Sequence, residues 1–148
     1  MKNDRYNARI LSELEKDGRI SNADLAEKIG LSASACLRRV QDLEKEGIIK
    51  GYKAVFDRRK LGVGFTAIVT VGLSVHTKEA QHAFEVAISD SSVVRECHNV
   101  TGSFEYMLRV ETQDLMTYKS FHTDLLGNIP NVATISTHVV MESVKDRE

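Results

Sequence analysis

Polar side chains recur at helical spacing in the N-terminal part of the chain, where they could bind a polyanion. With about 100° between successive residues of a helix, one side carries Ser34, Arg38, Gln41 and Lys45. The opposite side carries Cys36, Val40 and Leu43, which predicts an apolar stripe facing a core. Guanidinium and amide groups can hydrogen-bond to phosphates and to base edges in the major groove. This face therefore predicts contact with nucleic acid.

The residue types that most often catalyse reactions or bind metals lack the spacing for either role. Cys97 and His98 are adjacent in a predicted strand, so their side chains point to opposite faces and cannot readily share a metal ion. The other four histidines show no paired ligand spacing. Glu85, Glu96 and Glu105 form no visible acid–base pair with a nucleophile, and no glycine-rich phosphate or dinucleotide loop is present. We predict no catalytic residues, no metal, no cofactor and no enzymatic activity.

The composition is that of an ordinary globular protein. The chain has 148 residues, of which 42% are hydrophobic and 28% are charged. Its first nine residues are polar and lack the apolar core of a signal peptide, and the apolar run at 67–75 is too short to span a bilayer. Cys36 and Cys97 show no CxxC spacing and are interpreted as small hydrophobes in a reducing compartment. These features predict a cytoplasmic protein without a membrane partner.

The charge is distributed unevenly along the chain. Residues 1–60 contain 14 Lys and Arg against 10 Asp and Glu, a net charge of +4, whereas residues 61–148 contain 6 against 11, a net charge of −5. A basic N-terminal part joined to an acidic C-terminal part is typical of a polyanion-binding module attached to another domain.

Helix-capping residues divide the N-terminal part into three helices. The first helix is expected at 4–17, where Asp4 caps its start. Ser21 caps the second helix, which Gly30 ends, and Ser32 caps a third helix that ends at Gly47. Three short helices with a tight turn before the third predict a helix-turn-helix.

The segment after the third helix alternates weakly between apolar and polar residues. Residues 48–56 are therefore expected to form a short strand or hairpin arm, with Tyr52 and Lys53 on a wing beside DNA. Residues 57–60 are a charged connector. We predict a helix-turn-helix domain at 1–50, a strand or wing and linker at 51–63, and a second domain at 64–148.

The second domain is expected to alternate strands and helices in the order β-α-β-β-α-β. The expected strands are 65–75, 93–100, 104–110 and 132–144, and the expected helices are 77–89 and one that Asp114 caps. This order predicts an α+β, ferredoxin-like fold with a four-stranded antiparallel sheet and two helices on one face. The other face needs a partner, so such domains tend to dimerise.

Four motifs along the chain resemble the Lrp/AsnC family, the leucine-responsive or feast/famine regulators. They are KDGRISNADLAEKIGLS, ACLRRVQDLEKEGIIKGY, ECHNVTGSFEYMLRV and NVATISTHVVMESVK. Their order and spacing agree over nearly the whole chain. The resemblance implies a winged helix-turn-helix, a ferredoxin-like RAM domain, and homodimers that often assemble further into octamers. It also implies that double-stranded DNA and a small-molecule effector, an amino acid or related metabolite, are partners.

The resemblance also implies two sets of site residues. The DNA-binding motif falls between Asn22 and Gln41, which with the polar helix face makes the candidates Asn22, Ser32, Ala33, Ser34, Leu37, Arg38, Arg39, Gln41 and Lys45. The candidates for effector binding are Thr101, Gly102, Ser103, Phe104, Glu105, Thr134, Ser136 and Thr137.

Some of these positions admit two interpretations. Arg39 could contact a phosphate or form a structural ion pair, and Gly102 could open a ligand pocket, form an ordinary hairpin turn, or do both. Family members often carry acidic residues where Ser103 and Glu105 stand. Ser103 removes one carboxylate, and Glu105 lengthens the other by a methylene and could pair with a ligand ammonium group. A sensor that acts through protein partners is an alternative, but the basic N-terminal part favours DNA.

Overall fold

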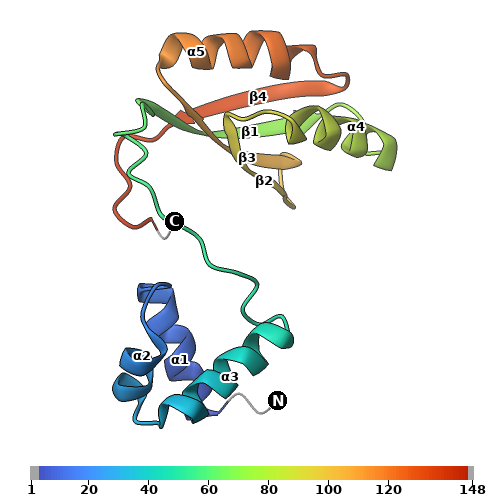
Figure 1. The fold of residues 1–148 in the computed structure, drawn as a ribbon. Helices are drawn as coiled ribbons and strands as arrows, with labels where there is room; N and C mark the ends of the chain where they lie inside the picture. The colour runs from blue at the N-terminus through green and yellow to red at the C-terminus, as the bar shows by residue number, and fades with distance from the viewer. Residues whose placement is uncertain (1–3, 147–148) are drawn as a thin grey trace. The chain divides into compact units, whose positions relative to one another are not determined.

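The computed structural model describes residues 4–146, which divide into two compact units (Figure 1). The first unit ends at Val55 and the second begins at Phe56. None of the helices formed by the described residues combines the length and the apolar character that crossing a bilayer requires.

The first unit consists of three helices, as the capping residues predict. They are α1 (Arg5–Lys16), α2 (Asn22–Ile29) and α3 (Ala33–Lys45). The side chains of Asp4, Ser21 and Ser32 accept hydrogen bonds from backbone amides in the first turns of the three helices. Buried hydrophobic residues from all three helices form the core of this unit: Ile10, Leu25, Ala26, Ile29, Cys36 and Leu43. The helix-turn-helix prediction is confirmed.

The predicted strand at 48–56 is wrong. The amides of Ile48 and Ile49 instead donate to the Leu43 carbonyl, 3.0 and 3.1 Å away, and close the C-terminal end of α3. The rest of the segment has no regular structure. A strand is stable only when its backbone groups pair with a neighbouring strand, and the described part of the first unit contains none.

The second unit is a four-stranded antiparallel sheet with two principal helices. Its elements are β1 (Phe65–Leu73), α4 (Lys78–Ser89), β2 (Val94–Asn99), β3 (Tyr106–Thr112), α5 (Leu115–Ser120) and β4 (Val132–Val139). A π-helical turn at Phe121–Leu125 and a 3-10 turn at Leu126–Asn128 extend α5. The strand order is β2-β3-β1-β4, and both helices cover one face of the sheet (Figure 1). The predicted α+β, ferredoxin-like fold is confirmed.

The last strand is shorter than the predicted 132–144. It pairs only with β1, and the ladder ends where Ala67 opposes Val139 and the Val140 amide donates to the Thr66 carbonyl. Because β1 begins at Phe65, residues 141–144 have no strand beside them to pair with. The third strand likewise begins at Tyr106 and not at 104, because the preceding residues form a loop.

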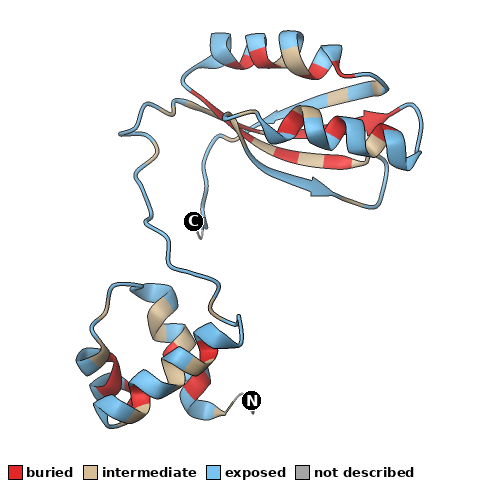
Figure 2. Ribbon diagram, turned by 45° about the vertical axis from the view of Figure 1, so that its right-hand side comes forward, coloured by how far each residue is buried: buried red, intermediate tan, exposed pale blue. Residues whose placement is uncertain are grey.

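The two faces of the sheet differ in what covers them. Ala67, Val69, Val71 and Leu73 of β1 point toward the helices and are buried with the rings of Phe84 and Tyr106, among others. Figure 2 shows the buried positions of α5 on the side that faces the sheet. Within the described part of the chain, no helix or strand packs over the face formed by the alternate positions of the strands (Figure 1). We call it the open face.

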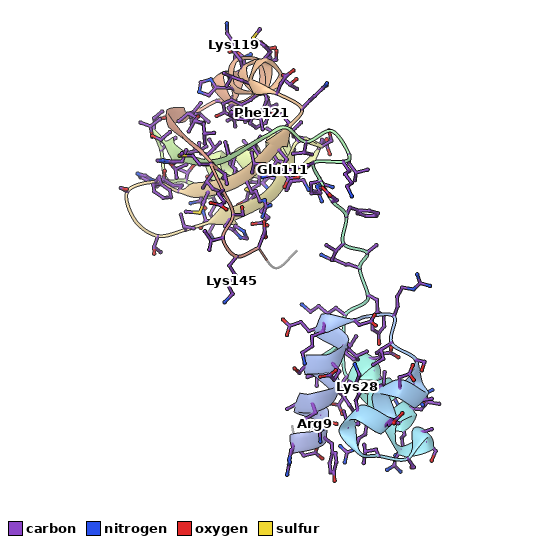
Figure 3. The ribbon with its side chains drawn as sticks, turned by 90° about the vertical axis from the view of Figure 1, so that its left-hand side faces the viewer. Arg9, Lys28, Glu111, Lys119, Phe121 and Lys145 are labelled. Atoms are coloured by element: carbon purple, nitrogen blue, oxygen red, sulfur yellow. The ribbon has the colours of Figure 1, made fainter. Side chains whose placement is uncertain are left out.

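A buried carboxylate on the open face gathers arginines from three segments. Glu111 of β3 is 6% exposed (Figure 3). Its Oε2 accepts from Arg58 Nε at 2.9 Å, and its Oε1 accepts from Arg109 Nε at 3.2 Å. Arg95 Nε lies 3.9 Å from Oε2, and Arg109 also binds Asp146 at 2.8 Å. The cluster fastens the start of the second unit and the segment after β4 to the sheet.

Candidate functional site

The outer side of α3 is an exposed polar face. Ser34, Arg38, Gln41 and Lys45 are exposed, whereas Cys36 and Leu43 on the opposite side are 0% and 1% exposed. Leu37 lies within this face and is 45% exposed. Among the described residues, none forms an ion pair or a hydrogen bond with the guanidinium of Arg38. The Arg38 side chain is therefore available for an outside partner.

Arg39 lies beside Arg38 in the chain but is held inside the first unit. Its Nη1 donates to Asp4 Oδ2 at 2.8 Å and to Asn7 Oδ1 at 2.9 Å. Its guanidinium also lies 5.4 Å from the centroid of the Tyr6 ring. The backbone hydrogen bond from Asn7, followed by the Arg39 contact, lowers the pKa of Asp4. The structural ion pair, one of the two interpretations of Arg39, is present and ties α3 to the start of α1.

Two polar contacts fix how α3 is presented. Asn22 Nδ2, at the start of α2, donates to the Ala33 carbonyl at the start of α3 over 2.8 Å. Ser32 Oγ accepts from the Ala35 amide at 3.3 Å and lies 3.4 Å from Ser34 Oγ. These contacts set the turn between α2 and α3, so the first turn of α3 keeps a defined position in the unit.

Tyr52 packs back onto the helices of the first unit. Its hydroxyl donates to Glu44 Oε1 at 2.8 Å, and its ring lies against Gly18 after α1. Burial, followed by the Glu44 contact, raises the pKa of Tyr52. The sequence interpretation placed Tyr52 on a wing strand, which does not form. The hydrogen bond to Glu44 holds the chain that leaves α3 against the helices.

In the second unit, the Glu105 carboxylate lies between the Leu73 amide and the His76 ring at the end of β1. Its Oε2 accepts from the Leu73 amide at 2.7 Å, and its Oε1 lies 3.0 Å from His76 Nδ1. The Glu105 amide also donates to the Val71 carbonyl at 3.0 Å, which anchors the backbone. The Glu105 side chain is 17% exposed. Its carboxylate therefore has a contact on each oxygen, on a side chain that is partly accessible to solvent.

Thr134 lies next to this carboxylate because of the strand register. It opposes Gly72 on β1, and a β-carbon added at Gly72 would collide with Thr134 Oγ1 and come within 3.7 Å of Glu105 Oε2. A side chain at position 72 would therefore displace the Thr134 hydroxyl. The hydroxyl and the carboxylate thus both lie near Gly72 on the open face.

The remaining predicted effector residues lie at different distances from this centre. Ser136 opposes Thr70, two residues along β4 from Thr134 and on the same face. Thr137 opposes Val69 on the helix-covered face, where its hydroxyl hydrogen-bonds to the Tyr118 hydroxyl. The structure therefore brings Glu105, Thr134 and Ser136 to one face and Thr137 to the other.

The loop between β2 and β3 is closed by backbone contacts at its ends. The Val100 amide donates to the Glu105 carbonyl at 2.8 Å. Thr101, Gly102 and Ser103 are exposed, and Phe104 is half-buried. Gly102 has a φ of 136°, which side-chain-bearing residues rarely adopt. The loop therefore leaves backbone and hydroxyl groups at the surface beside Glu105.

Sequence reasoning missed two residues of this site. The residues around Gly72 in the sequence do not mark it as part of a site, because the residue that it opposes, Thr134, lies on a strand far along the chain. His76 was considered only as a metal ligand, yet it contacts Glu105. Both depend on the register of β1 against its neighbours, which nothing in the local pattern specifies.

Two family models match the two units. The model described as "Lrp/AsnC ligand binding domain" matches residues 66–148, and the model described as "Winged helix-turn-helix DNA-binding" matches residues 3–50.

Known proteins are similar to the chain over nearly its full length. The transcriptional regulator AzlB of Bacillus subtilis (strain 168) is 40% identical over 136 residues, with 92% of this chain and 87% of AzlB covered. The leucine-responsive regulatory protein of Escherichia coli (strain K12) is 37% identical, with 96% and 87% covered. The crystal structure of transcriptional regulator NMB0573 of Neisseria meningitidis, a complex with L-Met, superposes with a TM-score of 0.92 at 29% identity, covering 97% and 92%.

Proposed function

The chain belongs to the Lrp/AsnC family of transcriptional regulators, and from this premise we propose that α3 reads specific DNA sites under the control of an amino acid bound near Glu105. The family consists of regulators and not enzymes, so the prediction of a non-enzymatic protein is confirmed. The observation that carries the proposal is the pair of faces that the structure leaves open, one in each unit. The DNA face is the polar side of α3, and the effector site is the surface around Glu105 and Thr134.

The DNA-contacting group in this proposal is centred on Arg38. Its free guanidinium, with the exposed Ser34 and Gln41, can donate to base edges and phosphates in a major groove. Lys45 and the Ser32 end of α3 suit backbone phosphates. Asn22 acts by fixing the α2–α3 turn, and Arg39 by fixing α3 on α1. The DNA partner also implies action in the cytoplasm.

The effector in this proposal is an α-amino acid. An amino acid carries an ammonium group, for which the Glu105 carboxylate is the matching acceptor, and the hydroxyls of Thr134 and Ser136 lie along the same face. Loop residues 101–104 supply backbone groups. Thr137 supports β4 from the other side through Tyr118. The likeness to the NMB0573 structure, a complex with L-Met, supports this class of ligand.

We further propose that the protein works as a homodimer that assembles to an octamer. No helix or strand formed by residues 4–146 covers the open face, and Met141 and Val144, which follow β4, are 96% and 93% exposed. A second copy would cover such apolar surface. Two α3 helices in a symmetric dimer would read half-sites about one helical turn, or a multiple of it, apart.

A thermal-shift titration tests the effector half of the proposal. A ligand that binds only the folded chain adds about 2.7 kcal/mol at a concentration of 100 times its Kd, so the melting temperature should rise with concentration. We expect this rise for at least one of the twenty amino acids, with L-leucine and L-methionine tested first. A folded Glu105→Gln variant, which lacks the negative charge, should not show this rise in melting temperature. A flat response to all twenty would contradict the proposed effector class.

A further inference from the structure

We infer that His76 is a positioning residue of the effector site, which orients the Glu105 carboxylate to receive the ammonium group of an amino acid. The inference rests on the proposed function, because it takes the surface around Glu105 as the effector site. It assigns to His76 the selection of amino acids over the corresponding 2-oxo acids.

The two oxygens of Glu105 have different neighbours. The Leu73 amide donates to Oε2 at 2.7 Å, and His76 Nδ1 lies 3.0 Å from Oε1, an ion-pair distance when the imidazole is protonated. A single contact would leave the carboxylate free to rotate about its last bond. With a contact on each oxygen, this rotation is restricted.

This arrangement leaves the carboxylate able to accept further hydrogen bonds. An ionised carboxylate offers about four acceptor positions, of which these contacts use two. On the open face, Glu105 Oε2 lies near Gly72, where Thr134 Oγ1 is another close neighbour. An ammonium group placed there would make charge-assisted hydrogen bonds to a carboxylate that is already oriented.

The side chain of Glu105 is one methylene longer than that of an aspartate. A glutamate has more rotatable bonds than an aspartate, and ordering it opposes binding through lost side-chain entropy. The contact with His76 lowers that cost, because it already restricts the Glu105 side chain. The His76 ring is 70% exposed and packs into no core, so its contact with Glu105 is the interaction that a substitution removes.

The test compares an amino acid with its 2-oxo acid in four proteins by isothermal titration calorimetry. The ligands are L-leucine and L-methionine and their 2-oxo acids, and the proteins are the wild type, His76→Ala, His76→Asn and His82→Ala. His82 is an exposed histidine on α4 and serves as the matched control.

We expect His76→Ala to weaken amino-acid binding about tenfold, the size of one hydrogen bond to a charged group, and to leave 2-oxo acid binding unchanged. Asparagine can place an amide N–H near the position of Nδ1, so His76→Asn should recover most of the affinity. His82→Ala should match the wild type. All variants should keep the wild-type melting temperature without ligand.

Three results would overturn the inference and leave the proposed function standing. They are unchanged amino-acid affinity in His76→Ala, equal losses for the amino acid and the 2-oxo acid, and tighter amino-acid binding. A wild type that binds neither amino acid, with the thermal screen flat for all twenty, would remove the proposed effector site and the inference with it.

A second measurement needs no ligand. Nitrogen NMR of the neutral His76 ring should show the proton on Nδ1, because that atom faces Glu105 Oε1. Glu105→Ala should remove this preference. A wild-type His76 with its proton on Nε2 would contradict the contact on which the inference depends.

Discussion

Replacing Arg38 by alanine is expected to weaken binding to a specific DNA duplex by about 1–3 kcal/mol without changing the stability of the protein. Arg38 is exposed on α3 and has no partner among the described residues, so its removal takes nothing from the fold. A bidentate arginine contact to a base, or a contact to a phosphate, is what the alanine removes. Fluorescence anisotropy titration with a duplex selected from a random library measures the loss.

The neighbouring Arg39 provides the matched control. Arg39→Ala breaks contacts to Asp4 and Asn7 and to the Tyr6 ring, so the free energy of unfolding should fall and amide exchange in α1 and α3 should accelerate. Two adjacent arginines thus have separable effects, one on DNA affinity and one on stability. Full DNA affinity in a folded Arg38→Ala variant would refute the assignment of α3 as the reading helix.

Replacing Glu111 by alanine is expected to lower the free energy of unfolding by about 3 kcal/mol. The carboxylate is buried and joins Arg58 and Arg109, so its loss takes this anion from two partly buried guanidinium groups, of which Arg109 keeps its contact with Asp146. The connection from Arg58 to the sheet is lost at the same time. Urea unfolding measures the change, and hydrogen exchange should show faster opening around residues 58–64.

Asp146→Ala is the control for this prediction. It removes only the outer partner of Arg109, at the surface, and an exposed pair of this kind contributes about 1 kcal/mol or less. A Glu111→Ala variant as stable as Asp146→Ala would show that the buried cluster contributes no more than a surface ion pair.

Much of the fold is local in origin and could therefore be predicted from the sequence. Asp4, Ser21 and Ser32 cap helices through atoms only two or three residues away, and the apolar stripe of α3 follows from its own spacing. The order of strands and helices in the second unit follows from similar patterns. The predicted strand at 48–56 failed because strand formation depends on a partner that the pattern cannot supply.

The site was less predictable because it depends on register. Thr134 and Thr137 are three residues apart, so strand alternation places them on opposite faces of β4, although the motif treats them as one group. Gly72 and His76 contribute only once β1 lies between β3 and β4. The different roles of Arg38 and Arg39 likewise depend on where α1 packs against α3.

Titration of a selected DNA duplex with and without a bound amino acid tests most directly whether this chain is an amino-acid-responsive DNA-binding regulator. The wild-type protein should bind the duplex with an affinity that falls steeply with salt, as phosphate contacts release counterions. Adding the amino acid that raises the melting temperature most should shift the isotherm, in affinity or in the number of copies bound, and its 2-oxo acid should not. Identical isotherms with and without any stabilising amino acid, or no sequence preference over random DNA, would contradict the proposed function.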